Sequence, residues 1–336
     1  MAETPPKSPI GGDGENLKNE LQGLTRRTNP HLVFFRTGAL GDSILLLPTV
    51  RLARRNFPAA RITVVASHWM KSLLRLWPDP PGYVSFDSAG LSSLFLRNST
   101  FSAPEWLNTA DLVVIYSSRE NTPLIDNLRQ TSPGAVMTAR TDPPSGMHAA
   151  RHFASAITGR VPRVEELPLP NLRAFGEHRQ SAKNWLNAHG IDADQSFAVI
   201  HPGSGSPRKC WPSENFAAIV NRLTVRGLPV VLLEGPADAS SVADTLTALP
   251  GPLQPPIARG RELGTVAGLL RRCALYLGND SGISHLAAAV GAPSVVVFGR
   301  TDPGIWHPIG ERVQVAGRKN RWPTRERVLG LVEDLM

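Results

Sequence analysis

The apolar residues of the chain fall into two patterns that alternate along its length. Short apolar runs without polar alternation are typical of strands that are buried on both faces of a parallel sheet. These runs cover residues 32–36, 61–66, 112–116, 197–200, 230–233, 275–277 and 294–298. Longer stretches with apolar positions at helical spacing cover residues 43–57, 147–158, 177–189, 214–226, 240–249, 263–271, 285–290 and 324–335. Because strand, helix and strand in this order form the crossover unit of a parallel sheet, the pattern predicts an α/β fold.

Three glycine-containing loops follow three of the predicted strands. They are TGALGD at residues 37–42, HPGSGS at 201–206 and GNDSG at 278–282. In parallel sheets ligands bind beyond the carboxyl ends of the strands, and a helix start there offers free N–H groups to an anion. We therefore interpret GNDSG as a cradle for a diphosphate. The alternative, that Asp280 and Ser281 only cap a helix, stays open.

Lys209 comes shortly after the second glycine loop. A glycine–serine loop with a nearby lysine is suited to holding phosphate through backbone N–H groups and one mobile charge. The alternative is a surface loop with a solvated lysine. The loop lacks the spacing of a Walker motif, which argues against a kinase or an ATPase. No loop carries the G-x-G-x-x-G fingerprint followed by an acid, which argues against a nicotinamide dehydrogenase.

Two predicted helices begin with residues that can cap a helix, and one of these residues, Asp42, also has a functional interpretation. Asp42 lies where the first loop meets its helix, and aspartate is a good N-cap there. A carboxylate at the mouth of a sheet can also take a proton from an acceptor hydroxyl. Pro48 predicts that this helix starts late or kinks. Ser213 is the expected N-cap of the helix at residues 214–226.

The 336 residues are long enough for two domains. Residues 1–29, with several Pro and Gly, are predicted to be a flexible tail. Residues 166–175 are the predicted linker between a first domain at 30–165 and a second domain at 176–322. The helix within residues 323–336 is expected to pack back on the first domain. Two stretches rich in Pro, Ser and Gly are predicted to be long loops, at residues 78–104 and 117–145.

The composition narrows the class of partner. The net charge is +8, and residues 43–78 hold six bases and no acid, which favours anionic partners. No nucleic-acid motif with interleaved aromatics accompanies these bases, so we expect no nucleic-acid partner. No run approaches the ~18 apolar residues of a membrane span. Two cysteines, Cys210 and Cys273, form neither a disulfide framework nor a zinc site. The D-x-D at residues 192–194 precedes a strand, and no metal site is predicted.

The three glycine loops and their flanks, in this order, resemble glycosyltransferase family 9, the ADP-heptose:lipopolysaccharide heptosyltransferases. The matching stretches are ALGDSILLLP with PAARITVVAS, HPGSGSPRKCWPSENF, and GNDSGISHLAAAVGAPSVVVFGRTDP with Trp306. They span roughly residues 31–308. The resemblance implies a GT-B fold, with two doubly wound Rossmann-like domains facing a central cleft. It also implies an inverting, metal-independent transfer of a heptose or related sugar from ADP-heptose to a lipopolysaccharide inner-core acceptor.

The resemblance also assigns roles to residues. It implies that Asp42 is the catalytic base and that Lys209 contributes to catalysis by meeting the donor diphosphate. The implied donor-binding residues are Gly41, His201, Gly203, Ser204, Gly205, Lys209, Asn279, Asp280, Ser281, Gly282 and His285. No cofactor is expected besides the nucleotide-sugar donor. The implied acceptor is an anionic glycolipid, and the implied location is the cytoplasm, with peripheral contact at the cytoplasmic face of the inner membrane.

Two departures from the family pattern bear on the donor. Near Gly235 many relatives carry a glutamate toward the nucleotide ribose, whereas this chain has Ala237, Asp238 and Ala239. The preference for adenine is therefore open. Ser281 replaces a threonine and keeps the hydroxyl. The alternatives are a transferase for another nucleotide sugar, a sugar-nucleotide epimerase, and a non-catalytic protein that binds sugar nucleotides.

Overall fold

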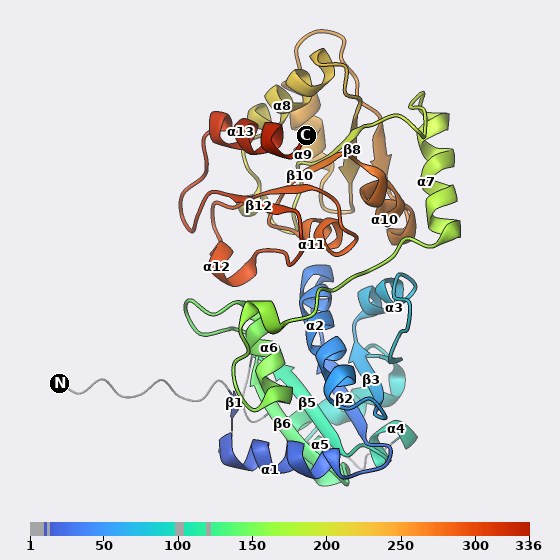
Figure 1. The fold of residues 1–336 in the computed structure, drawn as a ribbon, viewed down its shortest axis with the longest axis vertical. Helices are drawn as coiled ribbons and strands as arrows, with labels where there is room; N and C mark the ends of the chain where they lie inside the picture. The colour runs from blue at the N-terminus through green and yellow to red at the C-terminus, as the bar shows by residue number, and fades with distance from the viewer. Residues whose placement is uncertain (1–9, 12–13, 98–103, 119–121) are drawn as a thin grey trace, which may run out of the picture. The chain divides into compact units, whose positions relative to one another are not determined.

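The computed structural model describes residues 10–11, 14–97, 104–118 and 122–336 and divides into two compact units. The first unit comprises residues 1–74 and 79–168, and the second comprises residues 75–78 and 169–336. Figure 1 labels most of the helices and strands of both units. The division after Pro168 falls within the stretch expected to be the linker.

A six-stranded sheet forms the centre of the first unit, in the order β1-β6-β5-β2-β3-β4. Its strands are β1 (Ile10–Gly11), β2 (His31–Arg36), β3 (Arg61–Ala66), β4 (Gly82–Ser85), β5 (Leu112–Ser117) and β6 (Ala135–Arg140). All neighbours pair in parallel except β1, which pairs antiparallel with β6 at the edge. The chain runs outward from β2 in both directions across the sheet. The carboxyl ends of β2 and β5 therefore form the switch point where ligands bind in such sheets.

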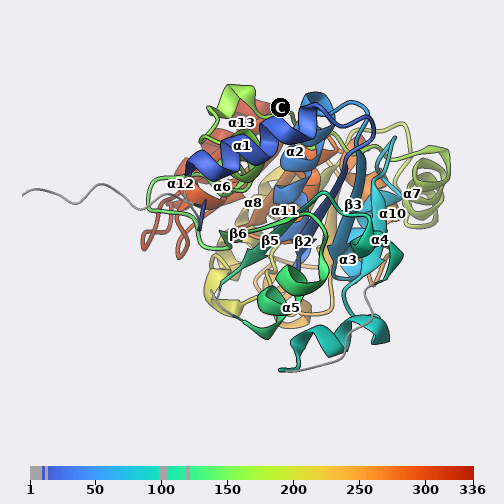
Figure 2. The ribbon, with the colours of Figure 1, turned by 90° about the horizontal axis from the view of Figure 1, so that it is seen from below.

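Helices cover both faces of the first sheet, as Figure 2 shows for α1, α2 and α6 on one side and α5 on the other. The helices are α1 (Gly14–Thr25), α2 (Leu40–Asn56), α3 (His68–Leu74), α4 (Glu105–Asn108), α5 (Pro123–Thr131) and α6 (Ala149–Thr158), with short 3-10 helices η1 (Ala89–Phe95) and η2 (Val164–Glu166). The expected late start of the helix around Pro48 is wrong. Helix α2 already begins at Leu40, and Pro48 lies buried inside it.

Parts of the first unit that were expected to lack structure are ordered. The tail expected at residues 1–29 contains α1, whose Leu17, Leu21 and Leu24 are buried. The apolar spacing of these leucines gives the helix a face to pack, which corrects the expectation for this part. Residues 1–9 and 12–13 lie outside the described residues. The two expected long loops hold β4, η1, α5 and β6, although residues 98–103 and 119–121 are likewise outside the described part.

A second six-stranded sheet, entirely parallel, forms the centre of the second unit in the order β12-β11-β10-β7-β8-β9. Its strands are β7 (Ala198–His201), β8 (Val230–Glu234), β9 (Ile257–Arg259), β10 (Leu275–Asn279), β11 (Ser294–Val297) and β12 (Val313–Ala316). The strand order reverses between β7 and β10. The switch point therefore lies beyond the carboxyl ends of these two strands.

Most helices of the second unit bury apolar residues, and three of them share one core with residues of the sheet. They are α7 (Gly176–Ala188), α8 (Ser213–Val225), α9 (Ala239–Thr247), α10 (Leu263–Arg272), α11 (Gly282–Ala289), α12 (Pro303–Trp306) and α13 (Arg325–Leu335), with the 3-10 helix η3 (Pro207–Lys209). Within the described residues no helix is both long and apolar enough to cross a bilayer.

Two local expectations about the second unit are corrected. Helix α13 does not leave this unit, because Val328, Leu331 and Val332 are buried in the same core as strand residues of β10 and β11. Ser213 is the first residue of α8 rather than its cap, and Pro212 precedes it at the cap position.

Candidate functional site

The loops after β7 and β10 meet at the switch point of the second sheet. His201 ends β7 and stands in register with Gly278 of β10. The loop after β7 contains Gly203, and the loop after β10 leads directly into α11, which begins at Gly282. The fold therefore puts two glycine-containing loops and a helix start, predicted from distant parts of the sequence, side by side.

Asn279 holds the two loops in a fixed arrangement. Its fully buried side chain donates from Nδ2 to the carbonyl oxygens of Pro202 (2.8 Å) and Gly203 (3.2 Å). Its Oδ1 accepts from the N–H of Trp211 (2.9 Å). Ser204 adds a bond from its hydroxyl to the carbonyl oxygen of Asp280 (2.8 Å). Because the amide pairs with backbone on both sides, Asn279 acts as a brace for the loops.

Lys209 reaches from the first loop to the second. Its Nζ lies 2.9 Å from Asp280 Oδ2, which also accepts from the hydroxyl of Thr301 (2.6 Å). The side chain of Lys209 is 37% exposed, whereas that of Asp280 is 8% exposed. The ammonium group is thus fixed at the mouth of the loops while part of it still faces solvent, where an anion can reach it.

A chain of three polar side chains runs beneath the loops. Asp238 Oδ2 pairs with His201 Nε2 (2.9 Å) and accepts the N–H of Gly235 (2.8 Å). Burial opposes ionisation of Asp238, but the bonds from His201 and Gly235 outweigh it and hold the pKa of this carboxyl below its usual value. The other ring nitrogen of His201, Nδ1, lies 3.3 Å from the hydroxyl of Ser281.

Ser281 and Gly203 connect the Asp238–His201–Ser281 series of side chains to the two glycine-containing loops. Ser281 is the N-cap of α11, and its hydroxyl accepts the N–H of Ser284 (3.4 Å). Gly203 packs against Asp238 so closely that a Cβ atom would lie 2.0 Å from Asp238 Oδ1. The buried His201–Asp238 pair therefore sets the position of both loops. His285 lies one turn into α11 and is buried.

The site residues of the first unit lie at the start of α2. Asp42 is the third residue of this helix, and its Oδ2 accepts the N–H of Ala39, the N-cap (3.0 Å). The expectation that Asp42 itself occupies the N-cap position is therefore corrected. Its Oδ1 pairs with Arg36 at the end of β2 (2.7 Å), and the Asp42 side chain keeps 30% exposure. The Arg36 side chain is 6% exposed and lies over the ring of Phe153.

The structure brings most of the predicted site residues together in one unit. The residues at the β7–β10 switch point are His201, Gly203, Ser204, Gly205, Lys209, Asn279, Asp280, Ser281, Gly282 and His285. Gly41 and Asp42 lie in the first unit, at the carboxyl end of β2. Among the described residues no group of three His, Cys, Asp or Glu side chains is arranged to hold a metal ion.

Sequence reasoning missed three residues that the geometry makes important. Asp238 stood out only as a departure from the family pattern, yet it anchors His201. Thr301 lies in the stretch FGRTDP and carried no signal of its own. Arg36 precedes the first glycine loop and reads as the end of a strand. The signal available for Arg36 was its position at the end of a strand, and the signal for Asp238 was its position in the loop that follows a strand. Side chains at both kinds of position reach the ligand edge of a parallel sheet.

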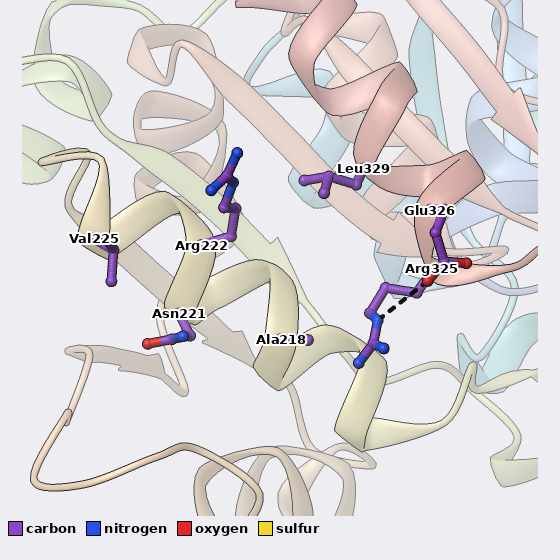
Figure 3. A pocket seen from close by; sticks show the side chains of 7 residues that line it. All are labelled: Ala218, Asn221, Arg222, Val225, Arg325, Glu326 and Leu329. Carbon is purple, nitrogen blue, oxygen red and sulfur yellow. Dashed lines mark ion pairs between the residues drawn. The ribbon is translucent and has the colours of Figure 1, made fainter.

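A shallow groove lies between α8 and α13, away from the glycine loops (Figure 3). It is lined by Ala218, Asn221, Arg222, Val225, Arg325, Glu326 and Leu329. None of the predicted site residues borders it. Its lining provides neither a nucleophile nor a set of backbone N–H groups for an anion.

Comparison with known proteins points to one family. The model of glycosyltransferase family 9 (heptosyltransferase) matches residues 140–333. Lipopolysaccharide heptosyltransferase 3 of Escherichia coli is 35% identical over 140 residues, which cover 39% of this chain and 40% of that protein. This chain thus spans about two fifths of that relative's length. Lipooligosaccharide heptosyltransferase 2 of Haemophilus influenzae is 23% identical over 82% of this chain and 85% of its own length.

The fold has a solved counterpart. The structure described as E. coli ADP-heptose lps heptosyltransferase II superposes with a TM-score of 0.70 at 19% identity, covering 91% of this chain and 98% of that one. At this identity the likeness concerns the fold alone. It confirms the predicted α/β class with two doubly wound sheets of the GT-B type.

Proposed function

Because the chain belongs to glycosyltransferase family 9, the heptosyltransferases, we propose that it transfers a heptose from ADP-heptose to an acceptor of the lipopolysaccharide inner core. The relatives named as heptosyltransferases 3 and 2 support the sugar and the acceptor class. The fold counterpart, described as using ADP-heptose, supports the donor.

The observation that carries the proposal is the meeting of Lys209 with two braced loops and the start of α11. A diphosphate needs several donors of hydrogen bonds and at least one positive charge in a small volume. The ammonium group of Lys209, 2.9 Å from Asp280, supplies the charge at this edge. The α11 start, capped by Ser281, adds free N–H groups and the positive end of a helix dipole.

These groups suit the leaving group of a sugar transfer. The acceptor oxygen forms a bond to the anomeric carbon while the bond from that carbon to the diphosphate oxygen breaks, and the electron pair stays on the diphosphate. The departing nucleotide gains negative charge in the transition state, so the donors around it bind it more strongly there than in the ground state. Lys209 and the α11 start thereby lower the barrier.

Asp42 is the proposed base that removes the proton of the acceptor hydroxyl as the new bond forms. One carboxylate oxygen is held by Arg36 and the other by the N–H of Ala39. This double attachment fixes the carboxylate plane, and its 30% exposure leaves room for a hydroxyl to approach. A positioned general base of this kind contributes roughly 10²- to 10⁴-fold to a rate.

An anionic acceptor at the cytoplasmic face of the inner membrane fits the basic character of the chain. Of the six bases in residues 43–78, however, Arg54 pairs with Asp79 and Arg75 pairs with Glu177. These two charges are partly neutralised, so the stretch attracts anions less strongly than its sequence implies. The proposal therefore relies on the family relationship for the acceptor and not on this stretch.

The direct test is transfer to defined acceptors. The protein is incubated with ADP-heptose and with core glycolipids truncated before the first, second or third heptose, and the products are analysed by mass spectrometry. We expect one acceptor to gain a single heptosyl unit with inverted anomeric configuration, and Asp42→Asn to abolish most of this gain. Absence of transfer to every truncated core would refute the proposed reaction.

A further inference from the structure

A tight turn after β12 presents three exposed cations, Arg318, Lys319 and Arg321. The N–H of Arg318 donates to the carbonyl oxygen of Arg321 (3.1 Å), and the N–H of Arg321 donates back to that of Arg318 (2.9 Å). Asn320, with φ of 60°, closes the turn. Among the residues that the structure describes, no carboxylate forms an ion pair with any of the three. We call residues 318–321 the basic turn.

Close packing fixes the basic turn to the end of β11. Gly317 has φ of 90°, and a Cβ atom there would lie 2.0 Å from the carbonyl oxygen of Phe298. On the other side of the turn, the Trp322 ring lies against Gly299, where a Cβ atom would be 2.0 Å from Trp322 Cδ2. Trp322 also packs on the core of the second unit. A turn held in this way presents its charges without a large cost in ordering the backbone.

The basic turn lies on the same edge of the sheet as the donor loops. Strands β10, β11 and β12 are parallel neighbours, so their carboxyl ends share one edge. Two strand spacings separate β10 from β12, which is roughly 10 Å. Arg300, which is exposed, follows β11 between them and has no ion-pair partner among the residues with described positions. Lys209, Arg300 and the basic turn therefore place positive charges along this edge of the sheet, from the glycine-containing loops after β7 and β10 to the turn after β12.

The carboxylates of this edge are already engaged elsewhere. Asp280 is held by Lys209 and Thr301, and Asp302 accepts the N–H of Gly304 as the cap of α12. Asp302 keeps its negative charge, because a hydrogen bond from an N–H does not neutralise a carboxylate. The basic turn itself carries three positive charges that have no ion-pair partner among the described residues. An anionic group bound there gains attraction without first displacing an internal ion pair.

We propose that the basic turn is a docking subsite for a phosphate group carried by the acceptor glycan. The identification of the ligand as the acceptor rests on the proposed function. The donor diphosphate has its own partners at Lys209 and the start of α11, two strands away. Three cations on one short turn fit one phosphate group better than an extended nucleic acid. Trp322, the aromatic residue next to the turn, is partly buried and packs on the core of the second unit, which leaves less of its ring for stacking on a base.

The test removes the charges of the basic turn and compares the result with an equal loss elsewhere. The variant is Arg318→Gln/Lys319→Gln/Arg321→Gln. The control is Arg179→Gln/Lys183→Gln/Arg271→Gln, which removes two arginines and one lysine from the exposed surfaces of α7 and α10. All substituted side chains are exposed, so both proteins are expected to fold, which their circular dichroism and thermal midpoints check.

Binding is measured by calorimetry with delipidated core oligosaccharides, truncated before the first, second or third heptose. Each is used in its phosphorylated form and after phosphatase treatment. We expect the variant to bind the preferred phosphorylated oligosaccharide roughly tenfold more weakly than the wild type does, because three exposed ion pairs are removed. Binding of ADP and of the phosphatase-treated oligosaccharide is expected to stay within about twofold. The control is expected to match the wild type in every case.

Three results would overturn the inference. The first is unchanged binding of the phosphorylated oligosaccharide, and the second is an equal loss of binding in the control. For the third, binding to vesicles of anionic phospholipid is measured alongside; a loss seen with the vesicles but not with the oligosaccharide would indicate a membrane surface instead. The transfer assay separates this inference from the proposed function. If the wild type transfers no heptose but the variant still loses phosphate-dependent binding, the proposed reaction fails and the anion subsite stands. If the wild type transfers heptose and the variant binds normally, only the subsite fails.

Discussion

The pairing of Lys209 with Asp280 predicts an unequal response of donor binding to the loss of each partner. The ammonium nitrogen lies 2.9 Å from the carboxylate, and the two residues lie in the loops that follow β7 and β10, where the diphosphate is proposed to bind. Lys209→Ala removes the positive charge, and among the described residues the Asp280 carboxylate then keeps Thr301 as its one side-chain hydrogen-bond partner. Asp280→Asn does the opposite, because it frees the ammonium group from its competitor.

The size of the effect follows from the interaction that each substitution removes. A hydrogen bond to a charged group contributes roughly 1.5–3 kcal/mol, so Lys209→Ala is expected to weaken ADP binding by roughly 10- to 150-fold. Asp280→Asn is expected to bind ADP at least as tightly as the wild type. The double variant is expected to recover up to roughly fivefold relative to Lys209→Ala, because the unpaired carboxylate no longer repels the phosphates.

The measurement is the Kd for ADP by calorimetry, in the wild type, the two single variants and the double variant. ADP is used in place of the nucleotide sugar so that contacts of Asp280 with the sugar do not enter. Lys183→Ala serves as the matched control, since Lys183 is an exposed lysine on α7. If Lys209→Ala binds ADP within about twofold of the wild type, or if the double variant is weaker than Lys209→Ala, the phosphate assignment is wrong.

Three further outcomes are expected. Asp42→Asn keeps an acceptor for the N–H of Ala39 but loses the base, so kcat is expected to fall roughly 10²- to 10⁴-fold while calorimetry shows an unchanged Kd for ADP. Gly203→Ala drives a Cβ atom into the buried Asp238 carboxylate, so calorimetric unfolding is expected to show a loss of about 1–3 kcal/mol; an unchanged Tm would contradict the packing. His31 and His152 are buried, and chiefly for that reason their pKa values lie below 6.5. Below about pH 6.5 the unfolded chain therefore binds more protons than the folded chain does, so the free energy of unfolding is expected to fall as the pH is lowered. Urea unfolding is expected to show this fall in the wild type and a shallower fall in His31→Gln and His152→Gln.

Strands buried on both faces were predictable from sequence, whereas partly buried strands were not. The runs that became β2, β3, β5, β7, β8, β10 and β11 are buried almost throughout, and burial on both faces requires continuous apolar residues. Strands β4 and β12 lie at the edges of their sheets, and β6 is bordered on one side only by the two-residue β1. Most residues of these three strands are only partly buried. Their mixed composition therefore gave no apolar run. Helix α1 was missed for a related reason, because its three buried leucines follow a stretch rich in Pro and Gly.

The glycine-containing loops were predictable from sequence because the residues that suit them to bind a phosphate are neighbours in the chain. Glycine, serine and a helix start must follow a strand directly for backbone N–H groups to surround an anion, and this order is written in consecutive residues. The functional partners of these loops are not local. Lys209 and Asp280 are 71 positions apart, and His201 and Asp238 are 37 apart.

The sequence by itself determined the alternation of strands and helices, the three glycine loops and the family to which the chain belongs. Only the tertiary structure decided which loops meet, because the order of strands in the sheet sets β10 beside β7 and makes Asp280 a partner of Lys209. It also decided that Asp238 lies beneath the loops as the anchor of His201, and that the basic turn shares the edge of the donor loops. The physical reason is that the apolar pattern of a strand or helix is written in consecutive residues, whereas contacts between side chains of different loops depend on how distant strands are ordered in the sheet.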